Sequence, residues 1–278
     1  MNGSLRLARG FARAPLTAQF GAIVIGIYIL VAILAPVLAP FSESDIVGAP
    51  FEPWGVTHLL GTDSLGRDML SRIMFGARNT IAIAFAATAI AFTVGAALGL
   101  YSSAVGGWVD ELFSRVVDAI MSVPILVSAL LLLTIFGTNL MTLILVIALL
   151  DSTRVFRLAR SVGMSLIAMD FIEVAKLRGE RTVWIVLREL LPNTAVPLTA
   201  EFGLRFCFVF LTIAALSFLG LGIQPPHADW GSMVRESAAL ISFGDVTPLI
   251  PAFAITLLTV SINFVVDWFL SKSGQSAP

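Results

Sequence analysis

Long stretches without Asp, Glu, Lys or Arg alternate with short charged segments along the chain. These stretches cover residues 14–42, 79–109, 119–150, 206–228 and 246–266. An ionised side chain is costly in hydrocarbon, and a spanning helix needs about 20 mostly apolar residues, so each stretch predicts at least one membrane span. The third stretch is interrupted by the turn-like residues 136–139 and is divided here into two helices.

The pattern therefore predicts an all-α integral membrane protein with six transmembrane helices. The expected spans are 19–39, 80–101, 112–135, 139–157, 196–221 and 249–270. An even number of spans puts both termini on one side of the membrane. The distribution of Lys and Arg, twelve against four, predicts that the N and C termini are cytoplasmic. The twelve are Arg6, Arg9, Arg13, Arg115, Arg154, Arg157, Arg160, Lys176, Arg178, Arg181, Arg188 and Lys272, and the four are Arg67, Arg72, Arg78 and Arg235.

Composition and charge exclude several classes of function. Hydrophobic residues make up 58% of the 278 residues and charged residues 13%, which disfavours a soluble enzyme. The net charge of −1 gives no basic face for nucleic acid. Both lysines, Lys176 and Lys272, lack the preceding glycine of a phosphate-binding loop, so ATP hydrolysis is not expected on this chain. No catalytic triad or resident metal site is expected from its two histidines and one cysteine.

The segment from about residue 156 to 195 mixes acidic, basic and apolar residues. Such mixing predicts amphipathic helix at the cytoplasmic face, with a break at Gly179 and a stop at Pro192. Because acids and bases are mixed, docking into a groove of a soluble partner is favoured over attraction to anionic lipid. The two outer segments, about 41–78 and 222–248, are too short for a catalytic domain. The first predicts a polar turn followed by a short amphipathic helix from Met69.

Several ordered motifs resemble those of bacterial ABC importer permeases. Glu173-Val174-Ala175, Gly179 and Leu191-Pro192-Asn193 are similar to the cytoplasmic EAA loop of this family, with Val174 in place of the second alanine. Three further blocks, GTDSLGRDMLSR at 61–72, ALSFLGLGIQPP at 215–226 and WGSM at 230–233, resemble the C-type permease subunit of the dipeptide, oligopeptide and nickel importers. The resemblance covers the whole chain.

The resemblance implies a type I ABC importer permease of the bacterial inner membrane. It implies an N-terminal part, residues 1–79, with a cytoplasmic segment, the first span and a periplasmic loop, and a permease core, residues 80–278, with five spans and the coupling loop. The expected partners are a homologous B-type permease, two cytoplasmic ATPases that bind ATP and Mg, an extracytoplasmic binding protein and membrane lipid. Peptides are the expected cargo, while nickel, glutathione or an opine remain alternatives. An ion-coupled secondary transporter is the competing class, although the internal repeats expected of it are not evident.

Two groups of residues are candidates for function. The resemblance assigns coupling to the ATPase to Glu173, Ala175, Gly179, Leu191 and Pro192, within a coupling helix spanning 173–192. Glu201 and Arg205 are four residues apart in span five, which predicts an ion pair at membrane depth. Such a pair, with Asn263 of the last span, is a candidate lining of the translocation path, and a structural pair at a subunit interface is the alternative. Gly95 and Gly99 predict close approach of another helix to span two.

Overall fold

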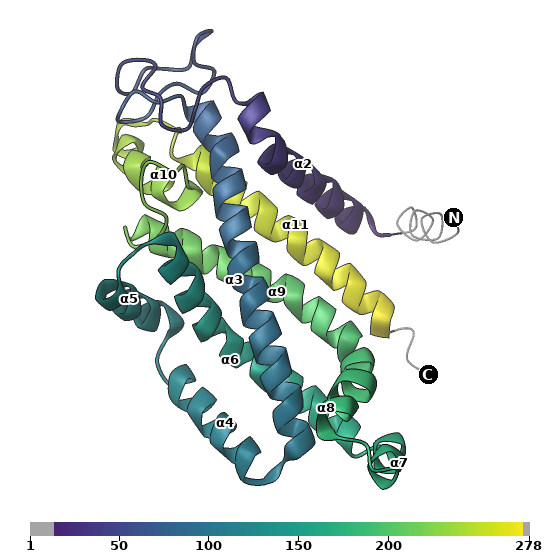
Figure 1. Cartoon of the computed structure of the whole chain (residues 1–278). Coiled ribbons are helices and arrows are strands. Elements are labelled where there is room, and N and C mark those ends of the chain that lie inside the picture. The colour runs from purple at the N-terminus through teal and green to yellow at the C-terminus, as the bar shows by residue number, and fades with distance from the viewer. Residues whose placement is uncertain (1–13, 275–278) are drawn as a thin grey trace. The chain divides into compact units, whose positions relative to one another are not determined.

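The computed structural model describes residues 14–274, and the regular elements of this range are helices (Figure 1). They are α2 (Leu16–Leu38), α3 (Met69–Val105), α4 (Gly107–Met121), α5 (Ile125–Phe136), α6 (Leu140–Ile167), α7 (Asp170–Leu177), α8 (Thr182–Ile185), the π-helical turn η1 (Val186–Leu190), α9 (Leu191–Phe218), α10 (Trp230–Ser237), the 3-10 segment η2 (Ala238–Phe243) and α11 (Leu249–Gly274). Isolated bridges such as Ile46 with Arg67 are the extended pairings in this range. The expected all-α class is confirmed.

Four helical stretches within residues 14–274 are long and apolar enough to cross a membrane: α2, α3, the continuous helix Thr182–Phe218, and α11. The bent pair α4 and α5 would add a fifth. Helix α6 has 28 residues, but Asp151, Arg154, Arg157 and Arg160 lie within it. The chain is thus a multi-pass membrane protein, and the count of six spans stays a prediction. The cytoplasmic orientation also stays a prediction, and Arg6, Arg9 and Arg13 lie outside the described residues.

The span expected over 112–135 is not one continuous helix. Helix α4 ends at Met121, α5 begins at Ile125, and the two are bent by 86°. Pro124 precedes the first residue of α5 and lacks the N–H that would continue the helix. The proline ring also disfavours helical backbone at Val123, so the chain turns there.

The separate short helix expected from Met69 is also wrong, because Met69 opens the 37-residue helix α3. Asp68 caps its start: the carboxylate Oδ2 accepts hydrogen bonds from the Ser71 backbone N–H at 2.8 Å and from the Ser71 hydroxyl at 2.7 Å. From that cap the apolar sequence runs without a helix-breaking proline to Val105. The polar turn and the span are therefore joined directly.

The chain forms two compact units. Unit 1 comprises the residues up to 84, residues 138–140 and those from 210 onward. Within it α2 packs along α11, where Gly21 faces the Ser261 carbonyl so closely that a side chain at Gly21 would collide with it. The Tyr28 hydroxyl donates to the Ala254 carbonyl at 3.1 Å. The absence of a side chain at Gly21 thus sets how closely the two helices approach.

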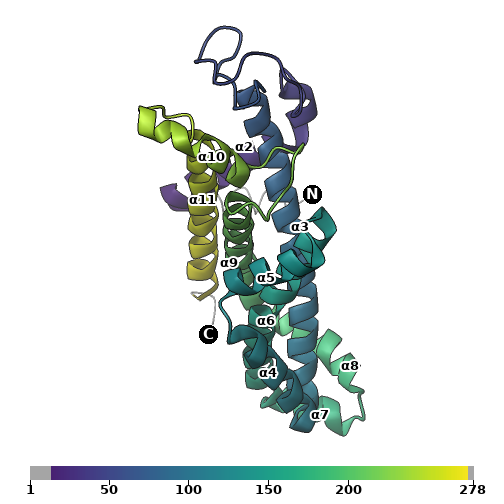
Figure 2. The same ribbon diagram turned by 90° about the vertical axis from the view of Figure 1, so that its left-hand side faces the viewer.

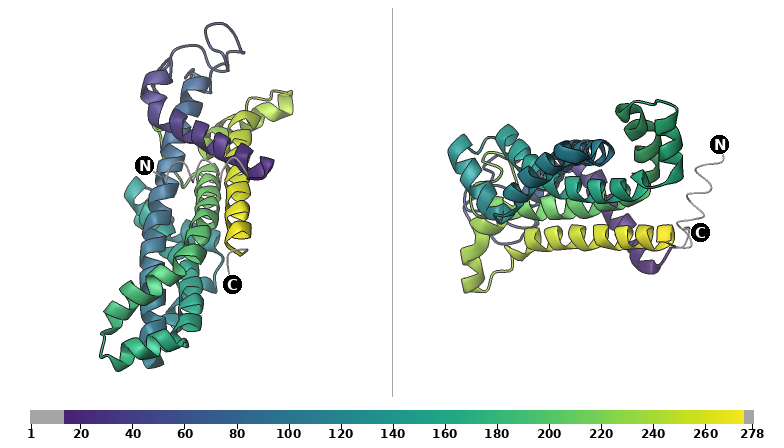
Figure 3. Two further views of the ribbon diagram at one scale, coloured as in Figure 1. Left: turned by 90° about the vertical axis from the view of Figure 1, so that its right-hand side faces the viewer. Right: turned by 90° about the horizontal axis from the view of Figure 1, so that it is seen from below.

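Unit 2 comprises residues 85–137 and 141–209. In this unit Gly95 and Gly99 let α3 lie against α6, as their four-residue spacing predicts. A Cβ atom at Gly99 would lie 2.6 Å from the Phe156 carbonyl oxygen, and one at Gly95 would lie 2.5 Å from that of Ser152. Apolar residues of α3, α6, α7, α8, η1 and α9 form one core around this contact. Figures 2 and 3 show α7 and α8 as short helices joined by a tight turn.

Candidate coupling segment and membrane-embedded ion pairs

Helix α7 ends in a turn that requires glycine. The Gly179 N–H donates to the Lys176 carbonyl at 2.9 Å, and the Glu180 N–H donates to the Ala175 carbonyl at 3.2 Å. This pair of bonds is the Schellman pattern, with Gly179 in the left-handed region at φ +80°. The predicted break at Gly179 is therefore confirmed. The coupling element expected over 173–192 is two helical pieces separated by this turn.

The two sides of α7 differ in their surroundings. Ile172 and Ala175 are fully buried in the core of unit 2, which fixes the helix to the bundle. On the other side Val174 is exposed, and 81% of the Leu177 surface is accessible. Glu173, the first residue of the EAA-like motif, is exposed as well. The helix thus presents apolar and charged side chains outward from a fixed base.

Pro192 does not stop the helix, so the expected stop is wrong. A continuous helix runs from Thr182 to Phe218, and the π-helical turn Val186–Leu190 directly precedes Leu191-Pro192. The Leu191 N–H bonds to the Val186 carbonyl, five residues back. This wider turn accommodates a proline whose ring would collide with the carbonyl four residues earlier in a regular α-helix. The Asn193 amide also donates to the Glu189 carbonyl at 2.6 Å.

Leu191 and Pro192 are both exposed, but they do not lie on α7 with Glu173 and Ala175. They lie at the start of α9, beyond the turn at Gly179. The five residues assigned to coupling therefore belong to three structural pieces: α7, its C-terminal turn and the first turn of α9. All of them lie in unit 2.

The predicted ion pair of α9 is present and has a third member. Arg205 Nε lies 2.7 Å from Glu201 Oε1, and Arg205 Nη1 lies 3.7 Å from Asp151 Oδ1 of α6. The guanidinium also lies 4.7 Å from the ring centre of Phe208. Asp151 was not among the residues that the sequence marked as candidates for function. Its position at the border of an apolar stretch of 32 residues was the available signal.

Asn263, the third residue expected with this pair, lies in α11 and in unit 1. Its side-chain amide donates to the Thr259 carbonyl at 2.9 Å, within the same helix. This bond satisfies one of the two amide donors inside the helix itself. Asn263 therefore belongs to the other unit, and its place beside Glu201 and Arg205 stays a prediction.

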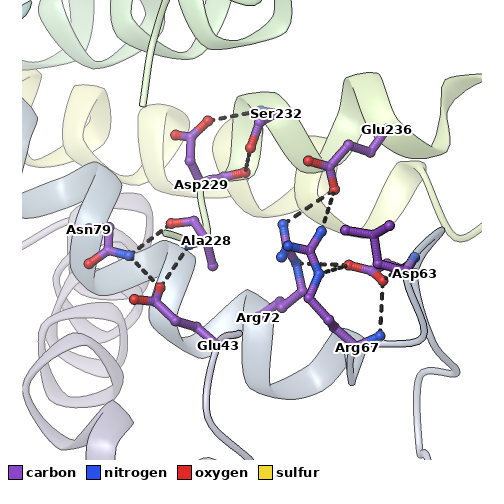
Figure 4. A network of polar contacts seen from close by, with 10 residues as sticks. Glu43, Asp63, Arg67, Arg72, Asn79, Ala228, Asp229, Ser232 and Glu236 are labelled. Atoms are coloured by element: carbon purple, nitrogen blue, oxygen red, sulfur yellow. Dashed lines mark hydrogen bonds and ion pairs between the residues drawn. The ribbon is translucent and has the colours of Figure 1, made fainter. Parts of the chain in front are cut away.

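A buried ionic network in unit 1 joins the loop before α3, and the first turn of α3, to α10 (Figure 4). Arg67 and Arg72 both contact Glu236, at 3.1 and 3.3 Å, and both contact Asp63, at 2.6 and 3.3 Å. Arg72 is almost completely buried. The motif at 61–72 contains Asp63, Arg67 and Arg72, and Glu236 follows the motif at 230–233. The pairing of these four residues depends on the fold. Two acids and two bases balance each other, as burial of charge requires.

Asp229 forms a second connection beside this network. Its carboxylate accepts the Ser232 N–H at 2.8 Å and so caps α10 (Figure 4). It also accepts the Thr80 hydroxyl at 3.0 Å, which ties α10 to α3. Burial raises the pKa of the Asp229 carboxyl above its ordinary value, and hydrogen bonds from Ser232, Ser217 and Thr80 oppose that rise. The start of α10 is thus held by a buried polar cluster.

Comparisons with known proteins agree with this architecture. Residues 91–272 match the family described as the binding-protein-dependent transport system inner membrane component. The chain is 35% identical to the dipeptide transport system permease protein DppC of Alkalihalophilus pseudofirmus, over 90% of this chain and 83% of the relative. It is 32% identical to the di/tripeptide permease protein of Pseudomonas aeruginosa, over 85% and 80%, and 31% identical to the glutathione permease protein GsiD of Pectobacterium atrosepticum, over 76% and 70%.

These matches cover most of the chain, including the coupling segment, the ion pair of α9 and the start of α10. A permease of this class is a membrane component that works with separate ATPase and substrate-binding components. It is not itself an enzyme, and it lies in the bacterial inner membrane. The chain belongs to the inner membrane permease family of binding-protein-dependent ABC importers.

Proposed function

We propose that this chain is the C-type permease of an importer for dipeptides and short oligopeptides, paired with a homologous B-type permease. The names of the Alkalihalophilus and Pseudomonas relatives support the peptide cargo. The Pectobacterium relative supports glutathione as a second candidate, and glutathione is itself a small peptide-like acid. Nickel and opines remain alternatives from the sequence alone. An external binding protein delivers the cargo.

The observation that carries the coupling role is the two-sided environment of α7. Ile172 and Ala175 anchor the helix in the core, while Val174 and Leu177 are exposed. Exposed apolar side chains on a charged, extramembrane helix favour contact with another protein over contact with water. We assign that contact to a cleft of the cytoplasmic ATPase. Glu173 and Lys176, both exposed, would add charged contacts at its rim.

Motion of α7 would reach the membrane through a stiff connection. The helix from Thr182 continues to Phe218 without a stop at Pro192, so no flexible loop separates the docking segment from the span. The turn at Gly179 and the π-helical turn before Pro192 are the two places where this connection departs from regular helix. Closure of the ATPase dimer on ATP and Mg would then bias the permease between two states.

The translocation path is assigned to the side of α9 that carries Glu201 and Arg205. Charged residues at membrane depth face protein or a water-filled path, because exposure to lipid is costly. Asn263 is retained as a candidate from the last span, contributed by unit 1. The outer loop and α10, fixed by the network of Asp63, Arg67, Arg72 and Glu236, would supply a rigid surface for the binding protein.

The test is reconstitution of the complete importer in proteoliposomes with its binding protein. We expect uptake of labelled dialanine to require ATP inside the compartment that holds the ATPases. Leu177→Ser is expected to weaken co-purification of the ATPases at least fivefold and to reduce uptake in parallel. Leu177→Met keeps an apolar side chain, so co-purification and uptake should both be retained. Uptake driven by an ion gradient without ATP would contradict the importer. Unchanged ATPase binding in the serine variant would contradict the role of α7.

A further inference from the structure

Within ion-pair distance, the cluster around Arg205 holds two carboxylates and one guanidinium. Glu201 and Asp151 each contribute a carboxylate, and Arg205 contributes one guanidinium. Arg205 lies 2.7 Å from Glu201 but 3.7 Å from Asp151, which is beyond hydrogen-bond distance. The face of Phe208 packs against the same guanidinium. Arg205 therefore compensates Glu201 more fully than it compensates Asp151.

Asp151 is nearly inaccessible, with 1% of its side chain exposed, and neither carboxylate oxygen accepts a hydrogen bond from the described residues. The neighbouring hydroxyls do not serve it. Ser152 donates to the Leu149 carbonyl and Thr153 donates to the Leu150 carbonyl, each within α6. A buried carboxylate without donors is costly, and a missing partner of opposite charge would remove that cost.

The next cation along α6 does not complete the cluster. Arg154 follows Asp151 by three residues, and it lines a small cavity with Met121 and Pro124 at the bend between α4 and α5. Its charge acts on Asp151 through space, but within the described residues the two side chains form no ion pair and Arg154 gives Asp151 no hydrogen bond. The partner that the carboxylates lack must therefore bring both a positive charge and N–H donors.

We propose that Asp151 and Glu201 bind the α-ammonium group of the permeating peptide. A primary ammonium supplies one positive charge and three donors, which match the excess charge and the two unserved oxygens of Asp151. The carboxylate end of the same peptide would be repelled, so the peptide would pass this point with its amino terminus toward the cluster. This inference rests on the proposed peptide cargo and deepens it, because it names the chemical group recognised at membrane depth.

The experiment measures peptide binding to the purified complete importer without its binding protein, by equilibrium dialysis. The probes are dialanine and N-propionyl-alanine, which keeps the skeleton but lacks the ammonium group. We expect the importer to bind dialanine at least about tenfold more tightly, the range of a charge-assisted hydrogen bond. Asp151→Asn should make the affinities for the two probes equal. Asp118→Asn, which removes an exposed acid of α4 in the same unit, should leave the ratio of the two affinities unchanged.

Two further measurements keep the result decisive. Glu201→Gln, at a more exposed position, should lower the ratio in the same direction, and Asp151→Glu should retain it, so the inference stays testable where the asparagine variant does not assemble. ATP-dependent uptake from the loaded binding protein is measured in parallel. If the importer takes up peptide but binds both probes equally, the ammonium site is overturned and the peptide function stands. A cation of the second permease that neutralised Asp151 would give this same result. Failure of the unaltered importer to take up peptide would refute the proposed function itself.

Discussion

Substitution of Gly179 isolates the contribution of one backbone conformation to the coupling segment. The residue has φ +80°, and, its two chain neighbours aside, no atom of residues 14–274 lies within 4 Å of the place where a Cβ would stand. The cost of Gly179→Ala is therefore conformational and not steric. A non-glycine residue in this region costs about 1–2 kcal/mol, which corresponds to roughly a 5–30-fold change in an equilibrium constant. Asn adopts the same conformation more readily, so Gly179→Asn is expected to cost less.

The assay is amide hydrogen exchange of the segment from Asp170 to Arg181 in the complete importer. The Gly179 and Glu180 N–H groups donate to carbonyls of α7, so opening of the turn exposes them. We expect exchange to rise about 5–30-fold in the alanine variant, and much less in the asparagine variant. Co-purification of the ATPases should weaken in the same order. Equal effects of the two substitutions, or no effect of either, would refute the reasoning from the left-handed turn.

Three further changes test other parts of the fold. Gly99→Leu should destabilise the protein by several kcal/mol, because the leucine side chain would push α3 away from α6. Gly26→Ala should not, because a Cβ there meets no described atom within 4 Å beyond its own helix. Thermal unfolding in detergent compares the two variants. Glu236→Gln should leave buried Arg72 short of a counter-charge and cost about 3–5 kcal/mol of folding stability. The loss should appear as faster proteolysis of the loop before α3. Proteolysis at the rate of the unaltered protein would argue against the network. Burial raises the pKa of the Asp229 carboxyl, so the contribution of this group to folding stability is fully present below about pH 4 and is lost as the pH rises through the higher pKa of the folded state. Thermal unfolding from pH 4 to 7 should therefore show a decline in melting temperature that Asp229→Asn reduces. An identical pH profile in that variant would assign the decline to other groups.

Sequence patterns were sufficient wherever a property depends on a short stretch of chain. The charge-free stretches located the apolar helices, because hydrocarbon excludes ionised side chains from any part of the chain that crosses it. The ion pair of Glu201 with Arg205 and the break at Gly179 also followed from local spacing and local conformation. The ion pair and the break are each decided within four or five residues, and each apolar helix within one continuous stretch.

Local rules failed where two of them competed. Pro192 was read as a stop, but the π-helical turn before it widens the helix enough to continue through the ring. Pro124 had the opposite outcome, since no such turn precedes it and the chain bends by 86°. A proline signals that a regular helix cannot continue unchanged. Whether the chain breaks or adapts depends on the surrounding backbone, which composition does not specify.

Only the tertiary structure decided which distant charges meet. Asp151 joins Arg205 across 54 positions of sequence, and Glu236 joins Arg72 across 164. Neither pairing follows from spacing, because it depends on how helices pack and on which faces they bury. The order of residues along the chain determined that it is an apolar, helical membrane protein with one segment that mixes charged and apolar residues. Packing determined that the Asp151 oxygens lack a hydrogen-bond donor, because the energy of a buried carboxylate depends on every donor within reach and not on its neighbours in sequence.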